Sequence, residues 1–186
     1  EEGKLRGNTV VATIVSNPAL DRFLNGCGIQ CVRSAVGERY VIEEMKKHGA
    51  NVGGEESGHM VLSDYGKTGD AMTAALVLAQ GLLKSGKKMS ELFPLFEPML
   101  RLRADSKFAT KEAMLAAFEL PEFQAAIHQA EQTVAGKGKV LVRKSGTEPK
   151  IQVWVWSDDR NLAEKVNDEV SSVLEKAAGF ETKKLV

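Results

Sequence analysis

The sequence predicts an α/β protein in which a domain with a mostly parallel sheet is followed by a smaller α+β domain. Over the first half of the chain, short β-branched runs alternate with helical segments, as they do in parallel sheets covered by helices. Near the middle, Pro94 and Pro98 bracket a short segment, and beyond them the pattern changes to alternating Leu and Arg. We therefore expect one domain at residues 1–97 and a second at residues 98–186.

The first domain is expected to begin with strand, helix, strand, helix. Residues Asn8–Val15 are mostly apolar and β-branched, which suits a strand buried on both faces. The pair Asn17-Pro18 marks the start of a short helix, and a second strand is expected at Ile29–Val36. A helix at Arg39–His48 follows, because its apolar residues recur at helical spacing, and Gly49 suits its C-terminal end.

The first domain then continues with a glycine-rich turn, a short strand and a long helix. The strand is expected at Met60–Leu62, and Thr68-Gly69-Asp70 introduces a helix at Ala71–Lys84. This helix is apolar on nearly all sides, so we expect it to be deeply buried.

The second domain is expected to contain two strands joined by a turn and backed by helices. Residues Thr110–Ala135 are helical in composition, with a break at Pro121. Strands are predicted at Lys139–Arg143 and Ile151–Trp156. An amphipathic helix at Asn161–Lys176 follows, because its apolar residues form one stripe.

Composition narrows the class of function. The 25 Lys and Arg residues balance the 25 Asp and Glu residues, so no global charge favours nucleic acid or an anionic membrane as a partner. The longest apolar run, Ala71–Ala79, is too short to span a bilayer, and no signal peptide is evident. We expect a cytosolic protein. Cys27 and Cys31 lack the second ligand pair of a zinc site, so no metal is assigned to this chain.

The first candidate ligand-binding loop is Gly53-Gly54-Glu55-Glu56-Ser57-Gly58-His59. Its glycines allow a sharp turn, and its carboxylates and hydroxyl suit a polyol, because a carboxylate accepts hydrogen bonds from neighbouring sugar hydroxyls. An ordinary polar surface turn explains the same residues equally well.

The second loop is Arg143-Lys144-Ser145-Gly146-Thr147-Glu148-Pro149, directly after a predicted strand. Backbone N–H groups around a glycine turn can bind an anion, and the hydroxyls of Ser145 and Thr147 add donors. Arg143 offers a planar fork that matches phosphate oxygens. The pattern favours phosphate binding over a plain solvated turn.

These two loops, together with SDYGKTGDA at Ser63–Ala71, VATIVSN at Val11–Asn17 and VGERYV at Val36–Val41, resemble the α-D-phosphohexomutase superfamily. The likeness in motif order and spacing runs from about Gly3 to Gly179. It implies that the chain comprises the third and fourth domains of such an enzyme, with domains 1 and 2 of the same protein as its partners. The activity implied is interconversion of the 6- and 1-phosphates of glucosamine through a bisphosphate, on the route to UDP-N-acetylglucosamine and peptidoglycan.

The resemblance also implies roles for individual residues. Glu55 and Ser57 would hold the hydroxyls of a hexosamine phosphate, and His59 would lie near its reacting end. Arg39 is a further candidate for the same cleft, although an exposed residue at a helix start is as reasonable an interpretation. The idle phosphate would be gripped by Arg143, Ser145, Gly146 and Thr147, with Lys144 contributing less because it alternates with Arg143 along the strand.

Two departures from the family pattern are evident. The family usually has an arginine at the position of Gln152, and Asn17-Pro18-Ala19 stands where a glycine is more common. The family's phosphoserine and its Asp-rich Mg²⁺ loop belong to the first two domains, and neither motif occurs here. We therefore expect this chain to bind a phosphosugar weakly and not to catalyse phosphoryl transfer.

Two alternatives stay open from the sequence. A superfamily member that acts on mannose or glucose phosphate would carry similar loops, although Glu56 and the SDYGKTGDA stretch favour glucosamine. A stand-alone phosphosugar-binding module without catalysis would also fit. Because Glu1–Leu5 resembles the end of a preceding helix, we expect the chain to be part of a longer protein.

Overall fold

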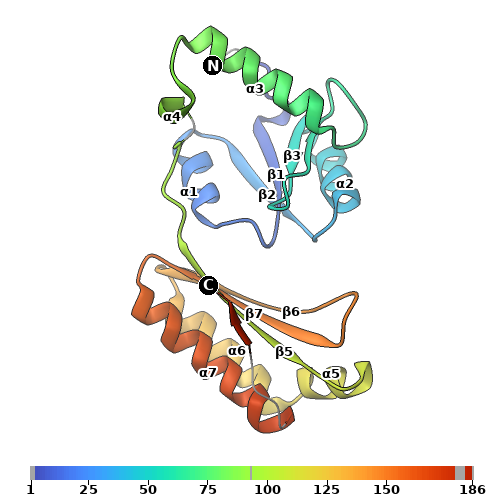
Figure 1. Ribbon diagram of the computed structural model, residues 1–186, viewed down its shortest axis with the longest axis vertical. Helices are drawn as coiled ribbons and strands as arrows, with labels where there is room; N and C mark the ends of the chain where they lie inside the picture. The colour runs from blue at the N-terminus through green and yellow to red at the C-terminus, as the bar shows by residue number, and fades with distance from the viewer. Residues whose placement is uncertain (1–2, 93, 179–182, 186) are drawn as a thin grey trace. The chain divides into compact units, whose positions relative to one another are not determined.

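The computed structural model describes residues 3–92, 94–178 and 183–185, of which 177, 178 and 183–185 are described by their backbone alone. Its contacts divide the chain into two units, Glu1–Pro98 and Met99–Val186. Each unit has its own sheet and is described separately (Figure 1).

The first unit is built around a four-stranded sheet with the strand order β2-β1-β3-β4. Its elements are η1 (Arg6–Asn8), β1 (Thr9–Thr13), α1 (Ala19–Gly26), β2 (Gln30–Ser34), α2 (Glu38–His48), β3 (Val52–Gly54), β4 (Met60–Leu62), α3 (Ala71–Ser85) and α4 (Met89–Leu92). The first three strands are parallel and β4 is antiparallel, so the mostly parallel sheet is confirmed. Figure 1 shows α1 and α2 on opposite sides of this sheet.

The core of the first unit lies between α2 and the sheet. Val11, Val41 and Val61 are fully or almost fully buried there, together with Met45. A Cβ atom on Gly53 would lie 2.6 Å from the Met45 sulfur and 2.7 Å from a Val41 methyl carbon. Glycine at this position is therefore what allows α2 to pack closely against β3.

Helix α3 begins where the sequence predicts but is not buried as expected. Asp70 caps it by accepting hydrogen bonds from the backbone N–H groups of Met72 (2.8 Å) and Thr73 (3.1 Å). Yet Met72 is 70% and Leu76 is 65% exposed. The expectation of deep burial was wrong, because α3 packs mainly against β4 and crosses the end of the sheet instead of lying on one of its faces (Figure 1).

The second unit has an antiparallel sheet with the order β6-β7-β5-β8. Its elements are β5 (Leu100–Lys107), α5 (Lys111–Phe118), α6 (Pro121–Val134), β6 (Gly138–Lys144), β7 (Lys150–Ser157), α7 (Arg160–Ala178) and β8 (Lys183–Leu185). The break at Pro121 and the hairpin of β6 and β7 are confirmed. The sheet is larger than expected, because β5 and β8 join the two predicted strands. None of the helices described is long and apolar enough to cross a membrane.

The two faces of the second sheet have different chemistry. Alternate residues of β5 and β7, such as Ala104 and Val153, point into a core formed with α5, α6 and α7 on one side of the sheet (Figure 1). The residues between them, such as Arg103 and Trp154, therefore lie on the other face. This second face, rather than the helical core, presents charged groups around the end of β6.

Candidate functional site

The first candidate loop connects β3 to β4 and is closed by its own backbone. The N–H of Glu55 donates to the carbonyl of His59 (2.9 Å), and the N–H of Gly58 donates to the carbonyl of Glu55 (3.1 Å). Gly58 has a φ of 97°, which only glycine adopts readily. The loop is thus a tight turn held between two paired strands.

Three predicted sugar-binding residues meet in this turn. The Glu55 side chain is only 10% exposed, and its Oε1 accepts a hydrogen bond from the N–H of Gly37 (2.8 Å). Its Oε2 lies 3.7 Å from Nδ1 of His59, and the same ring nitrogen is 3.0 Å from the Ser57 hydroxyl. The structure therefore brings Glu55, Ser57 and His59 into one polar group, in which Glu55 also supports the start of α2.

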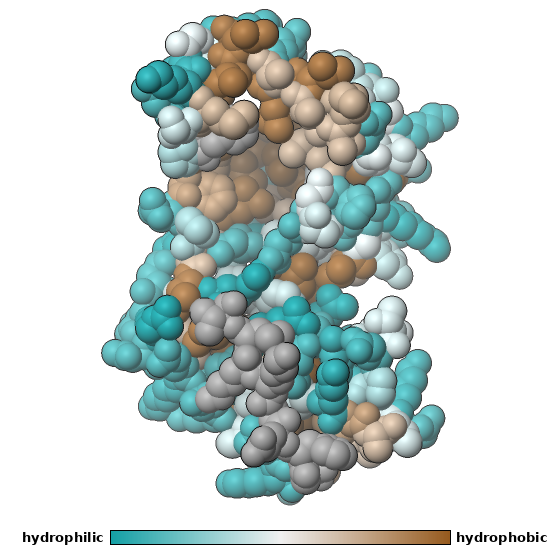
Figure 2. All heavy atoms as spheres, in the orientation of Figure 1, coloured by the Kyte–Doolittle hydropathy of each residue, from teal (hydrophilic) through white to brown (hydrophobic). Residues whose placement is uncertain are grey.

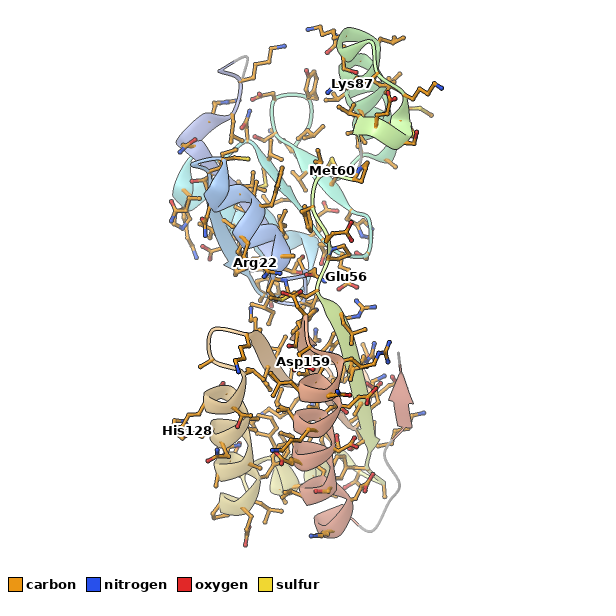
Figure 3. All side chains as sticks on the ribbon, turned by 90° about the vertical axis from the view of Figure 1, so that its left-hand side faces the viewer. Arg22, Glu56, Met60, Lys87, His128 and Asp159 are labelled. Carbon is orange, nitrogen blue, oxygen red and sulfur yellow. The ribbon has the colours of Figure 1, made fainter. Side chains whose placement is uncertain are left out.

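A hollow of about 330 Å³ lies beside this turn. Its lining combines apolar residues of the sheet and α1 with the turn itself, and comprises Val10, Val11, Ala12, Ser16, Asn17, Leu20, Val52, Gly53, Gly54, Glu55, Glu56, Gly58, His59, Met60 and Phe96. The labelled Glu56 and Met60 mark the loop and the start of β4 in Figure 3. Figure 2 shows hydrophobic atoms gathered around a recess on this unit. An apolar floor with polar groups at one edge suits the ring of a sugar.

Arg39 does not join this group. Its side chain is 83% exposed, and its Nε donates to Glu43 at 2.8 Å, one turn along α2. The neighbouring Glu38, which the sequence analysis did not single out, accepts a hydrogen bond from the N–H of Gly69 (3.0 Å). Glu38 thereby ties the Thr68–Asp70 segment to the start of α2. Its position could have drawn attention to Glu38 in the sequence, because an acidic residue in the first turn of a helix is favourably placed to accept hydrogen bonds from backbone N–H groups.

The second candidate loop connects β6 to β7. The N–H of Ser145 donates to the carbonyl of Lys150 (2.9 Å), while the Ser145 hydroxyl accepts from the N–H groups of Thr147 (3.4 Å) and Glu148 (3.3 Å). Nothing lies within 4 Å of a Cβ placed on Gly146, and its φ is not positive. Neither conformation nor packing requires glycine there, so its effect is to leave the approach to the backbone open.

Arg143 and Lys144 point to opposite sides of the second sheet. The Lys144 ammonium lies 4.3 Å from the ring centre of Phe118 and 3.8 Å from Glu119, on the helical side. Arg143 is half-buried and has no hydrogen bond or ion pair within the part of the chain that the structure describes. Burial and, after it, the nearby positive charge of Arg103 lower the pKa of Arg143.

The sequence analysis missed a charged cluster that borders Arg143. Arg103 forms two hydrogen bonds to Asp105, of 2.6 and 2.7 Å, and Lys150 lies 3.2 Å from the same carboxylate. Burial disfavours the charge on Asp105, but the hydrogen bonds from Arg103 and Lys150 outweigh it and hold its pKa below the usual value. The alternation of Leu and Arg in β5 was the signal that could have revealed this cluster.

The remaining titratable candidates have ordinary contacts. His48 lies 3.6 Å from Glu44, and His128 projects from the outer side of α6 towards Gln132 (Figure 3). Cys27 is exposed and Cys31 is half-buried, and no disulfide joins them. Among the described residues, no group of three or more His, Cys, Asp or Glu side chains could hold a metal ion.

Comparison with known proteins decides the family. Residues 1–99 match the model of phosphoglucomutase/phosphomannomutase α/β/α domain III, and residues 99–173 match that of the C-terminal domain. The chain belongs to the phosphoglucomutase/phosphomannomutase family. The predicted membership in the phosphohexomutases is confirmed by these two matches.

Curated relatives of this family member include phosphoglucosamine mutases from several bacteria. The protein from Paramagnetospirillum magneticum is 43% identical over 177 residues, and that from Novosphingobium aromaticivorans is 45% identical over 176 residues. Each alignment covers 95% of this chain but only 39% of the relative. The chain thus spans well under half of the length of the curated relatives it matches.

Solved structures support the fold. N-acetylphosphoglucosamine mutase from Aspergillus fumigatus superposes with a TM-score of 0.77 at 18% identity, over 91% of this chain and 38% of that one. An N-acetylglucosamine-phosphate mutase of the α-D-phosphohexomutase superfamily gives 0.71 at 17% identity, over 89% of this chain and 38% of that one. The chain therefore shares its fold with these two enzymes.

Proposed function

We propose that this chain is the sugar-recognition and phosphate-binding part of a cytosolic phosphoglucosamine mutase. The whole enzyme would interconvert glucosamine 6-phosphate and glucosamine 1-phosphate through a bisphosphate, as a step towards UDP-N-acetylglucosamine and peptidoglycan. The observation that carries this proposal is Arg143, a half-buried guanidinium without a partner in the described chain, beside a turn whose backbone at Gly146 is open to approach. The names of the curated relatives supply the choice of sugar.

Residues 1–97 form the sugar-recognition domain in this proposal. Ser57 and His59 are well placed to contact sugar hydroxyls, because both are on the outside of the turn. Glu55 has one oxygen committed to Gly37, so its second oxygen is the one left for a hydroxyl. Arg39 stays a weaker candidate, since it would first have to leave Glu43.

Residues 98–186 form the phosphate-binding domain. Arg143 supplies charge and a planar donor fork, and Ser145, Gly146 and Thr147 supply an accessible backbone and hydroxyls. Lys144 contributes weakly, because its ammonium lies over Phe118 on the other side of the sheet. The substrate must be bound in two orientations during the reaction, so a grip on the idle phosphate is a requirement of the chemistry.

The phosphoryl group itself would be handled elsewhere in the full-length enzyme. Mg²⁺ neutralises charge that develops on a transferring phosphoryl group, and a phosphoserine donates that group. Among the described residues, no three or more His, Cys, Asp or Glu side chains gather as a metal site. We assign both functions to the family's first two domains, which would be this chain's partners.

The experiment that tests the proposal compares turnover of glucosamine 6-phosphate, glucose 6-phosphate and mannose 6-phosphate by the full-length protein. We expect preference for glucosamine 6-phosphate, and a preference for either other sugar would reassign the substrate within the family. The 186-residue chain alone should show no turnover, with or without Mg²⁺ and a bisphosphate primer. Turnover by the purified chain would refute this division of roles.

A further inference from the structure

The face of the second sheet that carries Arg143 also carries a second arginine close by. Strand pairing places two neighbouring rows across β6, β7 and β5, namely Arg143, Gln152 and Asp105 in one row and Leu141, Trp154 and Arg103 in the next. Arg143 and Arg103 are thus one row apart on the two outer strands of this group. Trp154 lies between them on β7.

Arg103 is fixed in position from two sides. Its Nε and Nη2 donate to the two oxygens of Asp105, and its guanidinium lies 4.8 Å from the ring centre of Trp154. These contacts use one edge of the guanidinium. Its Nη1 group donates to no residue in the described part of the chain. An arginine held in this way is already ordered, so binding through its free edge costs little conformational entropy.

The charges on this face do not balance. Around Asp105, the cations are Arg103, Arg143 and Lys150 and the carboxylates are Asp105 and Glu148, both of which Lys150 contacts, at 3.2 and 2.7 Å. Other residues of β5 and β6 on the same face, namely Arg101, Lys107 and Lys139, add further positive charge. The excess positive charge around Asp105 therefore falls at Arg143. The residue between Arg143 and Asp105 in their row is Gln152, which is neutral. It is only 7% exposed, and its side chain has no hydrogen bond among the described residues.

The positive charge of Arg103 acts on Arg143, whose guanidinium has no carboxylate partner among the described residues, so an anion that contacts both arginines would be stabilised. Lys150, the one cation of β7, is already engaged by Asp105 and Glu148, so the second donor for an anion beside Arg143 is sought on β5. We propose that Arg103 is a second phosphate-binding residue, and that with Arg143 it selects the dianion of a phosphate monoester. This inference deepens the proposed function and rests on it.

The test is a titration of the 186-residue chain with inorganic phosphate, followed by the backbone amide signals of residues 143–147. We expect Arg103→Gln to weaken binding about tenfold, as loss of one charge-assisted hydrogen bond would. Arg103→Lys keeps the charge but loses the fork, so we expect an intermediate loss. Arg101→Gln is the matched control, because Arg101 also lies over Trp154 (5.2 Å) but one row farther from Arg143, and we expect less than about a twofold change.

A second readout separates phosphate binding from a purely structural role. Wild-type affinity should rise between about pH 6 and about pH 8, as phosphate becomes a dianion, and Arg103→Gln should flatten that rise. Arg103→Gln could destabilise the fold by leaving the Asp105 carboxylate with fewer partners. The double variant Arg103→Gln/Asp105→Asn removes both members of the ion pair, and we expect it to lose the same phosphate affinity as Arg103→Gln. Urea unfolding of each variant checks this.

The possible results separate the role of Arg103 from phosphate binding by the loop at residues 143–147. Loss of binding in Arg143→Gln, with wild-type affinity and pH dependence in both Arg103→Gln and the double variant, would overturn the role of Arg103 and leave the phosphate loop in place. Absence of phosphate shifts at residues 143–147 in the wild-type chain would instead refute the proposed function.

Discussion

The two loops differ in how their charged groups are satisfied. In the first unit, Glu55 is nearly buried and is held by Gly37, and Ser57 and His59 bond to each other. In the second unit, Arg143 has no partner among the described residues, and the positive charge of Arg103 acts on it. A turn for neutral hydroxyls can be self-satisfied, because it exchanges one hydrogen bond for another. A site for an anion retains its positive charge until the ligand neutralises it.

The largest effect that can test this contrast is at Arg143. Arg143→Ala should weaken phosphate binding by about 10- to 150-fold, because a charge-assisted hydrogen bond contributes roughly 1.5 to 3 kcal/mol. Lys144→Ala is the matched control and should change it less than about threefold, since Lys144 lies over Phe118. Isothermal titration of phosphate measures both. Equal losses in the two variants would show that net charge, and not the placement of Arg143, governs binding.

Two glycines offer a second comparison between the loops. Gly53→Ala should destabilise the first unit by about 1–3 kcal/mol, because the new methyl group would overlap Met45 and Val41. Gly146→Ala should leave unfolding within about 0.5 kcal/mol of wild type, since the space around it is open. It should nevertheless weaken phosphate binding by obstructing the backbone. Urea unfolding and phosphate titration of both variants are the measurements, and a stability loss in Gly146→Ala would contradict this account.

The pH dependence of stability should distinguish the second unit from the first. Because the pKa of Asp105 is lowered in the folded chain, its ion pairs stabilise the fold above the unfolded pKa of aspartate, and this contribution is lost as pH falls through the folded pKa. Asp105→Asn should therefore cost about 1–3 kcal/mol near neutral pH and progressively less below about pH 4. Urea unfolding across this range measures it. A difference that does not change with pH would mean that packing, not charge, is lost.

The smallest expected effect is at Ser57. Its hydroxyl is hydrogen-bonded to His59, and the pair is exposed, so Ser57→Ala should change the free energy of unfolding by less than about 0.5 kcal/mol. In the full-length enzyme it should raise the KM for glucosamine 6-phosphate severalfold by removing a sugar contact. An unchanged KM would remove Ser57 from the proposed sugar site.

Much of the local structure was predictable because it depends on short-range effects. Met60–Leu62 is the strand β4 as expected, and Gly49 ends α2 with a φ of 63°. The hairpin of β6 and β7 follows from two β-branched runs around a turn. Alternation along β6 also indicated that Lys144 points away from Arg143, since successive side chains of a strand face opposite sides.

The sequence by itself determined the order of most elements, the family and the positions of the two candidate loops along the chain, because spacing and residue type carry that information. It did not predict β5 and β8. The tertiary structure decided which side chains meet. Arg103 and Arg143 are 40 positions apart in the numbering, and only the pairing of β5 and β6 with β7 brings them to the same face. The exposure of α3 was likewise undetermined by its apolar composition, because burial depends on what packs against a helix, and α3 packs mainly against β4.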